Sequence, residues 1–302
     1  MNEYQSISNL EEIIKLSKES INDNYKLNFS IKVNFDIALI DNKILDVHDD
    51  ALAFQAPKCP NNLQMNHGEY IHKNKDGIKN VINELNAKDT SNRAIISLIN
   101  QDDIIGSGDK PIPSFMILQF SIENDNELYV TTYFRALEVS KFLRINVEEI
   151  RMIIEKIKSE ILKISKVNLN ILAFRAYKKE NINPLKRAEI DLLKSNEIFG
   201  LLKTNKSKFI DLLEEKKTKS TVIEYQSFQY IFDWLNDSYS KDDIHKDINK
   251  LLVKSKFQEL IELSKEIKDL REKTSHSPQI DEKQEKYIKL IDDITMEIRN
   301  DS

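Results

Sequence analysis

The side chains best able to act as nucleophiles or metal ligands are few in this chain and widely spaced. A single cysteine, Cys59, excludes an internal disulfide and the Cys-x-x-Cys pairs of zinc and redox sites, and we interpret it as a structural or surface thiol. The five histidines stand at positions 48, 67, 72, 245 and 276, so no two share a helical turn on which both could hold one metal ion. We interpret them as surface or singly hydrogen-bonded side chains and expect no metal site.

Glycine-based phosphate loops are also missing from the sequence. The chain has five glycines, whereas the GxGxxG dinucleotide loop and the P-loop both need glycine where backbone lies close against phosphate. With 45 basic and 50 acidic residues and a net charge of -5, the chain lacks the overall basic field that drives nonspecific binding of nucleic acid. Any phosphate site must therefore be local, and a nucleic-acid partner is not expected.

The hydrophobic period changes near residue 187 and divides the chain into two parts. Residues 1–187 mix strand and helix patterns, which predicts an α+β domain. Strands are expected at 25–33, 35–40, 94–99, 114–122, 127–133 and 169–174, and helices at 76–86 and 147–164. Residues 188–302 are helical in pattern almost throughout, so an all-helical C-terminal domain or arm is expected.

Within this second part, turn chemistry separates five expected helices. They are expected at 189–203, 206–217, 222–234, 242–270 and 281–299, with 273–278 as the clearest linker. The apolar residues of 242–270 fit a packed hairpin arm or a short coiled coil, and we favour a helical bundle because heptads are not sustained. The Lys- and Glu-rich stretch 214–219 is interpreted as solvated helix surface.

The N-terminal sequence has neither the basic nor the apolar region of a secretory signal. No stretch approaches the ~18 apolar residues that a membrane span requires. With 40% apolar residues the chain can fill a core. A soluble, cytoplasmic protein without membrane association is therefore expected.

The stretch from Ile112 to Val147 resembles the thymidylate synthase family. In that family a strand opens with Pro-Cys-His and runs on to Gln-Phe, and the next strand ends in Tyr-Gln-Arg-Ser-x-Asp. An asparagine at the head of a long helix follows. The residues in this register, without a gap, are Pro113, Gln119, Phe120, Tyr133, Arg135 and Asn146.

Two further motifs stand in the family's order. Residues 88–97 resemble its Asp-Pro-x-Ser-Arg-Arg segment, and residues 174–177 resemble its His-x-Tyr. The resemblance covers roughly residues 70–187 and implies a thymidylate synthase-like α/β domain, with a mixed sheet and a long helix. It also implies a homodimer.

A pyrimidine-nucleotide site is what this resemblance implies. Arg135 would grip the nucleotide 5′-phosphate, and Arg93 would reach the same phosphate from the partner subunit. The donor fork of a guanidinium matches phosphate oxygens. Asn146 would read the pyrimidine edge, because an amide donates and accepts at once. Tyr177 would hold the ribose 3′-hydroxyl.

The family's nucleophile is absent. Ser114 stands where the resemblance expects cysteine, and Phe115 follows it where the family has histidine. A serine needs an adjacent general base, which a phenylalanine does not supply, whereas a cysteine is partly thiolate near neutral pH. Ser114 is therefore predicted to be inert, which favours a protein without enzymatic activity but leaves an enzyme open.

Other departures change the residues around the phosphate. Asn92 replaces the first arginine of the Arg-Arg pair, and Ala136 replaces a phosphate-binding serine. Glu138 replaces an aspartate, and Arg175 replaces the ribose-binding histidine; both are kept as candidate nucleotide-binding residues. The rearranged charge suits a ligand other than an unmodified monophosphate. No segment resembles the family's Glu-Glu-Leu-x-Trp helix, so neither folate nor another cofactor is expected.

Three functions remain open from the sequence. The first is a catalytically inactive nucleotide-binding protein that acts as a sensor or regulatory subunit, with its helical region contacting a protein partner. The second is an active pyrimidine-nucleotide-modifying enzyme, methyl- or hydroxymethyltransferase-like, that works without a cysteine. The third is a structural scaffold with a vestigial pocket. The first is favoured because the phosphate grip is retained while the nucleophile is lost.

Overall fold

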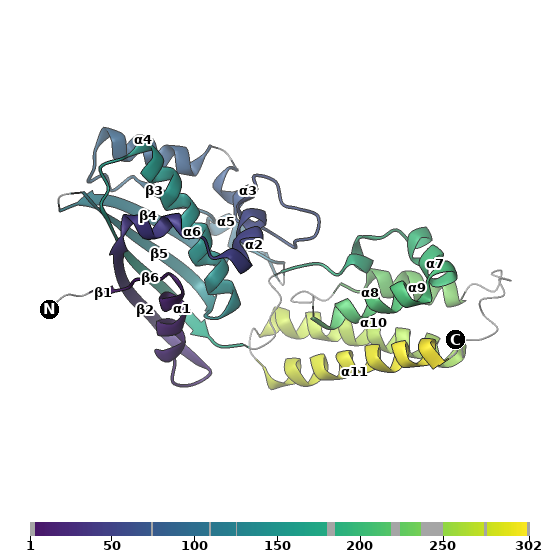
Figure 1. Cartoon of the computed structure of the whole chain (residues 1–302). Coiled ribbons are helices and arrows are strands. Elements are labelled where there is room, and N and C mark those ends of the chain that lie inside the picture. The colour runs from purple at the N-terminus through teal and green to yellow at the C-terminus, as the bar shows by residue number, and fades with distance from the viewer. Residues whose placement is uncertain are drawn as a thin grey trace. The chain divides into compact units, whose positions relative to one another are not determined.

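The structure is a computed structural model, and it describes residues 4–300 except 74, 109, 125, 180–184, 219–223, 237–249 and 275–276. The chain divides into two compact units, drawn in Figure 1. The first unit comprises Met1–Pro60, Met65–Ser107 and Ile112–Glu180, and the second comprises Asn61–Gln64, Gly108–Pro111 and Asn181–Ser302. No helix among the described residues is both long and apolar enough to cross a membrane.

A six-stranded mixed sheet forms the centre of the first unit. The strands, in spatial order, are β1 (Gln5–Ser6), β2 (Tyr25–Asp36), β6 (Lys166–Tyr177), β5 (Glu127–Glu138), β4 (Phe115–Glu123) and β3 (Ile95–Ser97). The β1–β2 and β5–β6 pairs are parallel, and the other pairs are antiparallel. Together with the helical second unit, this sheet confirms the expected α+β fold class.

Helices cover one face of this sheet, as Figure 1 shows. They are α1 (Glu11–Glu19), α2 (Leu45–Gln55), α4 (Gly77–Ala87) and α6 (Lys141–Glu160). Short elements connect them: η1 (Ile37–Asp41), α3 (Gly68–Ile71) and α5 (Gln101–Ile104). The long helix α6 packs on β5 and contacts α1, α2 and α4.

The burial pattern of β5 shows which face the helices cover. Leu128, Val130 and Phe134 are buried, while the alternating Tyr129 and Tyr133 are only half-buried. Because successive side chains of a strand point to opposite faces, the sheet has one helix-covered face and one partly open face. The alternation places Arg135 on the partly open side.

The observed elements differ from the expected ones where contacts with distant residues determine where a strand or helix begins and ends. The strands β5 and β6 continue to Glu138 and Tyr177, past the expected ends at 133 and 174, because these two residues still pair with each other. Residues 37–41 form a 3-10 helix instead of continuing a strand, because the Asp36 carboxylate accepts the N–H of Ala38 at 2.8 Å and caps it. Helix α6 begins at Lys141, earlier than the expected 147.

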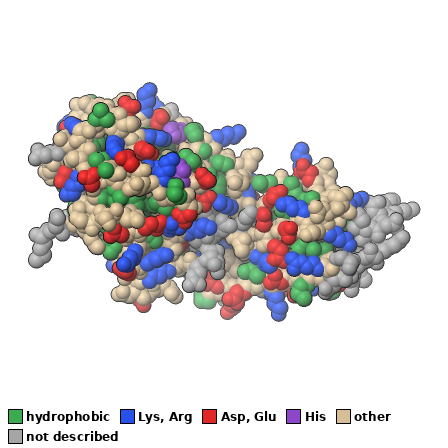
Figure 2. Space-filling model, viewed as in Figure 1, with side chains coloured by type: hydrophobic (Ala, Val, Ile, Leu, Met, Phe, Trp, Pro, Cys, Tyr) green, Lys and Arg blue, Asp and Glu red, His purple; other side chains and the backbone are tan. Residues whose placement is uncertain are grey.

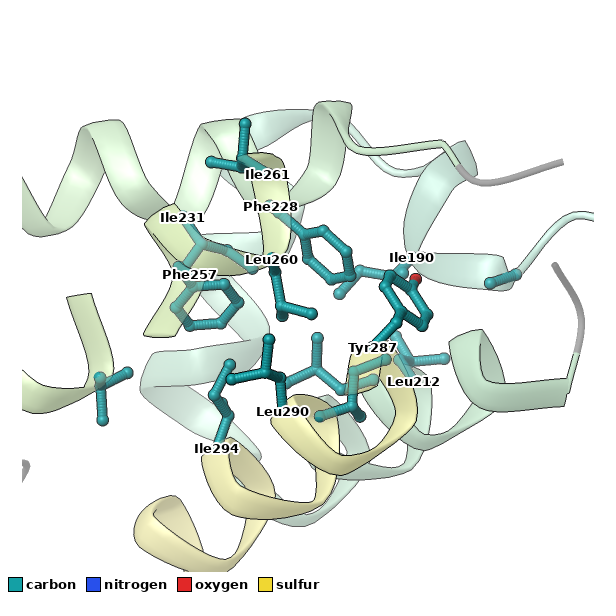
Figure 3. Close-up of a cluster of buried hydrophobic side chains, with 14 of the residues drawn as sticks. Ile190, Leu212, Phe228, Ile231, Phe257, Leu260, Ile261, Tyr287, Leu290 and Ile294 are labelled. Atoms are coloured by element: carbon teal, nitrogen blue, oxygen red, sulfur yellow. The ribbon is translucent and has the colours of Figure 1, made fainter. Parts of the chain in front are cut away.

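The second unit is a bundle of helices, as expected. It contains η2 (Glu189–Leu192), α7 (Ser195–Thr204), α8 (Lys206–Thr218), α9 (Gln226–Asn236), α10 (Lys250–Lys273) and α11 (Pro278–Asn300). Helices α10 and α11 pack against each other, α9 packs on α10, and α8 packs on α11. Their shared core is shown in Figure 3, where Phe228, Phe257 and Leu290 face one another.

One expected helix of this unit is divided in the structure, and the start of another lies outside the described residues. The helix expected at 189–203 is divided into η2 and α7. The start of the helix expected at 242 lies outside the described residues.

Lys216 corrects the interpretation of 214–219 as solvated surface. Acidic and basic side chains do mix on the face shown in Figure 2, but the Lys216 side chain is fully buried. Its ammonium group donates to Asp191, and it lies 4.4 Å from the centre of the Phe228 ring. The interpretation failed because the sequence around Lys216 does not show that this lysine is buried beside a carboxylate.

Candidate functional site

The pairing of the strands is interrupted along one row of the sheet. Asn28 of β2, Phe174 of β6 and Arg135 of β5 are left out of the ladders, although the residues on both sides of each are paired. In β4 the register shifts between Phe115 and Ile117. The register of β2, β5 and β6 is unchanged across this row, whereas a shift such as that in β4 redirects side chains and is common next to binding sites. Here the row contains Arg135, the first of the candidate phosphate ligands.

Arg135 is fixed by the segment that leads into β4. Its backbone N–H donates to the Ser114 carbonyl oxygen at 2.9 Å. Its guanidinium donates from Nε to the Pro113 carbonyl oxygen at 3.2 Å and from Nη2 to the Ile112 carbonyl oxygen at 3.0 Å. A guanidinium has five N–H donors, so most of its fork stays available on the exposed side of the residue.

Tyr177 lies in the electrostatic field of Arg135. Burial raises the pKa of the Tyr177 hydroxyl to about 12; the charge of Glu138 adds to this rise, and the charge of Arg135 opposes it. Although Arg135 is exposed on one side, the atoms packed around its other side desolvate it and lower the pKa of its guanidinium. The structure therefore brings Arg135, Glu138 and Tyr177 to the same end of β5 and β6.

Glu138 caps the long helix α6. It is 2% exposed, and its carboxylate accepts the backbone N–H groups of Ser140, Lys141 and Phe142 at 2.7, 2.8 and 3.0 Å. A negative charge is favourable at a helix N-terminus because the first N–H groups have no partner within the helix. This anion-binding position is thus occupied by a side chain of the protein itself.

Of the other two candidate arginines, Arg175 is paired with Ala136, the residue after Arg135, whereas Arg93 lies further along the sheet. Arg175 of β6 is half-buried, and its guanidinium stacks 4.2 Å from the centre of the Tyr25 ring. Arg93 is exposed in the loop before β3, where its backbone N–H donates to the Ser91 hydroxyl. Because β3 is the edge strand next to β4, Arg93 lies across the sheet from Arg175 and Tyr177.

These three arginines share one property. Among the described residues, no carboxylate lies within ion-pair distance of Arg93, Arg135 or Arg175. By contrast, Arg144, Arg151, Arg187 and Arg299 each have a carboxylate partner among the described residues. The arginines singled out by the resemblance are thus charges that no described acidic group neutralises.

Asn146 lies inside the domain, in the second turn of α6. It is 4% exposed, and its Nδ2 donates to Oε2 of Glu149, one turn further along, at 3.0 Å. Glu149 is itself 1% exposed, and both its carboxylate oxygens lie near Nδ1 of His67, at 2.9 and 3.0 Å. Asn146, Glu149 and His67 therefore form one buried polar group.

This buried group reaches the start of β4, which directly follows Ser114. The His67 ring packs edge-on against Phe115, the residue after Ser114, with 5.6 Å between ring centres. It also packs against Phe54 of α2 at 5.2 Å. The aromatic rings enclose the polar group, so a ligand that reached it would be largely desolvated.

Sequence reasoning did not find Glu149 or His67. One signal was present, because Glu149 occupies a position of the long helix where the apolar period places buried residues. An acidic residue at a buried helical position requires a partner. The partner, 82 positions away in the chain, carried no sequence signal of its own.

Ser114 has no general base within the described residues. It is half-buried, and its hydroxyl forms no hydrogen bond with a described side chain or backbone group. Cys59, the only thiol, is half-buried, with its Sγ 3.6 Å from the Pro60 carbonyl oxygen. Among the described residues, no group of three or more His, Cys, Asp or Glu side chains is placed to hold a metal ion.

Comparisons with known proteins complete the description of the site. No family model matches the chain. No curated protein matches it. Among solved structures, the chain is similar to the thymidylate synthase of T4 phage, with 15% sequence identity and a TM-score of 0.40, over 56% of this chain and 76% of that one.

Proposed function

We propose that the first unit binds a pyrimidine nucleotide by its phosphate and its base and does not turn it over. The observation that carries this proposal is the coincidence of two independent properties. The motifs select Arg93 and Arg135, and Arg175 stands where the family has a histidine; these same three arginines lack a carboxylate partner among the described residues. A guanidinium left without an internal anion favours an external one, and a phosphate matches its donor fork.

The absence of turnover follows from the surroundings of Ser114. A serine becomes a nucleophile when a base hydrogen-bonded to its hydroxyl removes the proton. No described side chain makes that hydrogen bond. Incubation with dUMP and methylene-tetrahydrofolate, followed by mass spectrometry of the nucleotide, is expected to return unmodified dUMP. Transfer of a one-carbon group to dUMP would instead show that the protein is an active pyrimidine-nucleotide-modifying enzyme.

Nucleotide binding is tested by thermal shift. At 100 times its dissociation constant, a ligand stabilises the fold by about 2.7 kcal/mol. We expect a shift with at least one of dUMP, dTMP, dCMP and dTTP, and none with the corresponding nucleosides, because they lack the phosphate. Arg135→Ala should abolish the shift. Arg299→Ala, which removes an exposed arginine 3.8 Å from Glu214, should preserve it.

Two results of this screen would contradict the proposal. An equal shift for the wild type and Arg135→Ala would place the nucleotide elsewhere. No shift with any nucleotide would favour a scaffold with a vestigial pocket.

A homodimer is the second part of the proposal. Arg93 is exposed and lies far along the sheet from Tyr177. Its position therefore supports a site in which Arg93 of one subunit completes the pocket of the other. Mixing Arg93→Ala with Arg135→Ala protein should then restore binding at about a quarter of the sites, because half the dimers are mixed and each has one intact site. No restoration after subunit exchange would contradict a shared site.

The third part concerns the helical unit. A nucleotide-binding protein without turnover transmits information when the ligand changes the affinity for a second partner. We assign that partner, a protein, to the helical unit. Pull-down with the full chain as bait, with and without saturating nucleotide, should recover a protein whose amount depends on the nucleotide. A partner recovered equally from Arg135→Ala protein and wild type under both conditions would contradict a regulatory role.

A further inference from the structure

A surface cavity of about 410 Å³ lies where α1 and α2 begin. It is formed by residues 8–11, Leu39 and residues 42–46, all of them in the first unit. Pockets that take up ligands measure about 300–1,000 Å³, so this cavity has room for a large side chain of another molecule. None of the candidate nucleotide-binding residues lines it, so it is separate from the proposed nucleotide site.

The walls of the cavity are tied together by Arg144 of α6. Its Nε lies 3.0 and 3.1 Å from the two carboxylate oxygens of Glu11, the first residue of α1. Its Nη1 and Nη2 donate to the two oxygens of Asp46 of α2 at 2.5 and 2.7 Å. The backbone N–H of Ile44, which also lines the cavity, donates to the buried Glu148 carboxylate at 3.1 Å. Bidentate ion pairs that form a network hold their geometry, so the cavity exists before a ligand enters it.

Two exposed leucines of α2 lie on one face of the helix beside this cavity. Leu45 lines the cavity and is 80% exposed, and Leu52 is 46% exposed. The two are seven positions apart, so they lie two turns apart, about 10 Å along the helix axis. The opposite face of α2 is buried through Val47 and Phe54. Single exposed leucines are common on protein surfaces, whereas an apolar stripe beside a cavity is typical of an interaction site.

The same surface is acidic. The sequence of α2 contains no lysine or arginine but three aspartates, which are Asp46, Asp49 and Asp50. Arg144 faces two carboxylates, those of Glu11 and Asp46, so it neutralises only part of their charge. Lys43 is the basic residue among the side chains that line the cavity. The acidic groups therefore outnumber the basic ones, which favours a positively charged partner.

The geometry points to a docking site for a basic amphipathic helix of a partner protein. We call this site the α2 surface, and it consists of the cavity, Leu45, Asp49 and Leu52. An apolar side chain of the partner helix fills the cavity beside Leu39, and others on the same face of that helix pack on Leu45 and Leu52. Lysine or arginine side chains on its flanks lie close to Asp49 and compensate its charge. This interaction goes beyond nucleotide binding and does not depend on it.

Selection from a phage library of randomised helical peptides tests the proposal, with the immobilised full-length protein as target. We expect the enriched peptides to carry more lysine and arginine than aspartate and glutamate, with apolar residues at helical spacing. Their affinity for the protein in solution is then measured by fluorescence anisotropy. Leu45→Ser should weaken binding at least about tenfold, because it removes an apolar contact at the mouth of the cavity. Asp49→Lys should also weaken binding, and it should reduce the dependence of binding on salt.

Two exposed residues of the same unit provide matched controls. Leu162 is 85% exposed and does not line the cavity, and Glu160 is an exposed acidic residue at the end of α6. Leu162→Ser and Glu160→Lys repeat the two chemical changes away from the α2 surface. Both should leave the affinity within about twofold of wild type. Melting temperatures check that all four variants are folded.

Several outcomes would overturn the proposal. One is that no peptide is enriched, and another is that the enriched peptides are acidic. A third is an affinity that Leu45→Ser and Asp49→Lys leave unchanged, because the peptide then binds elsewhere. Neutral phosphatidylcholine vesicles provide the last test: recruitment of wild type but not of Leu45→Ser would make the α2 surface a membrane contact. Loss of nucleotide binding in wild type would end the proposed function and leave this proposal standing.

Discussion

The ammonium group of Lys216 lies 2.6 and 2.7 Å from the two carboxylate oxygens of Asp191, inside the helical bundle. A third bond runs to the Glu224 carbonyl oxygen at 2.5 Å. Burial lowers the pKa of Lys216, and the charge of Asp191 opposes that change. The pair joins η2 to α8 and tolerates its burial because each charge has a direct partner.

Removing one member of this pair should be costly. Lys216→Met is expected to lower the free energy of unfolding by about 3–5 kcal/mol, because it leaves Asp191 as an unpaired buried charge. The double variant Lys216→Met with Asp191→Leu should lose clearly less. Urea denaturation measures both. The exposed pair of Lys208 and Glu189 provides the control, and Lys208→Met should cost less than about 1 kcal/mol. An equally mild effect at both lysines would contradict this account.

The Glu138 cap should stabilise α6 measurably. Glu138→Ala is expected to cost about 2 kcal/mol in chemical denaturation, because three backbone N–H groups lose a charged acceptor. Glu160→Ala, at the exposed C-terminal end of the same helix, should cost little. If the two variants were equally stable, the cap would have no energetic role.

The raised pKa of Tyr177 predicts a loss of stability at alkaline pH. In the folded protein the hydroxyl keeps its proton up to a pKa of about 12, whereas the ordinary pKa of a tyrosine hydroxyl is 10.0. Between these values the folded state holds more protons than the unfolded one, so stability falls as the pH rises through this window. Below pH 10 the contribution is fully present.

Tyr177→Phe isolates this contribution. The variant should lose less stability than wild type between pH 10 and pH 12. Titration of the tyrosine near-ultraviolet absorbance should show one late-titrating phenol fewer. Parallel pH profiles for the two proteins would show that Tyr177 titrates normally.

A cysteine at position 114 should report on the ligand. In protein carrying Cys59→Ser and Ser114→Cys, the only thiol lies at the position of the missing nucleophile. Saturating nucleotide should slow its alkylation by at least about tenfold, because a bound pyrimidine ring shields it. Protein with Cys59 alone should react at the same rate with and without nucleotide. An alkylation rate at position 114 that the nucleotide leaves unchanged would show that the nucleotide does not bind next to this residue.

The spacing of apolar residues was enough to predict helices whose packing face is visible in the sequence. The apolar spacing of Ile78, Val81 and Leu85 predicted α4, and the structure has it at Gly77–Ala87. The ends of β5 and β6 could not be predicted, because Glu138 and Tyr177 are held in the sheet by each other and not by their neighbours in sequence. The start of α6 depends likewise on a carboxylate that lies outside the helix.

The candidate site divides in the same way. Arg135 and Asn146 were chosen from spacing, but their surroundings were invisible in the sequence. The carbonyl groups that hold the Arg135 guanidinium belong to a segment 22 and 23 positions away, and they are backbone atoms that every residue carries. Burial of Glu149 against His67 depends on the packing of α6 on the preceding segment, which a local period does not encode.

The antiparallel contact of β2 with β6 has a consequence for synthesis. Ser30 of β2 donates a hydrogen bond to the Asn170 side chain of β6 at 3.4 Å, and the two residues are 140 positions apart in the chain. On the ribosome β2 therefore emerges long before its neighbour exists, with Phe29, Val33 and Phe35 still uncovered. Contacts of such long range are formed late and slow folding down. The nascent chain thus passes through an extended interval in which an apolar strand waits for its partner, when chaperones would be needed most.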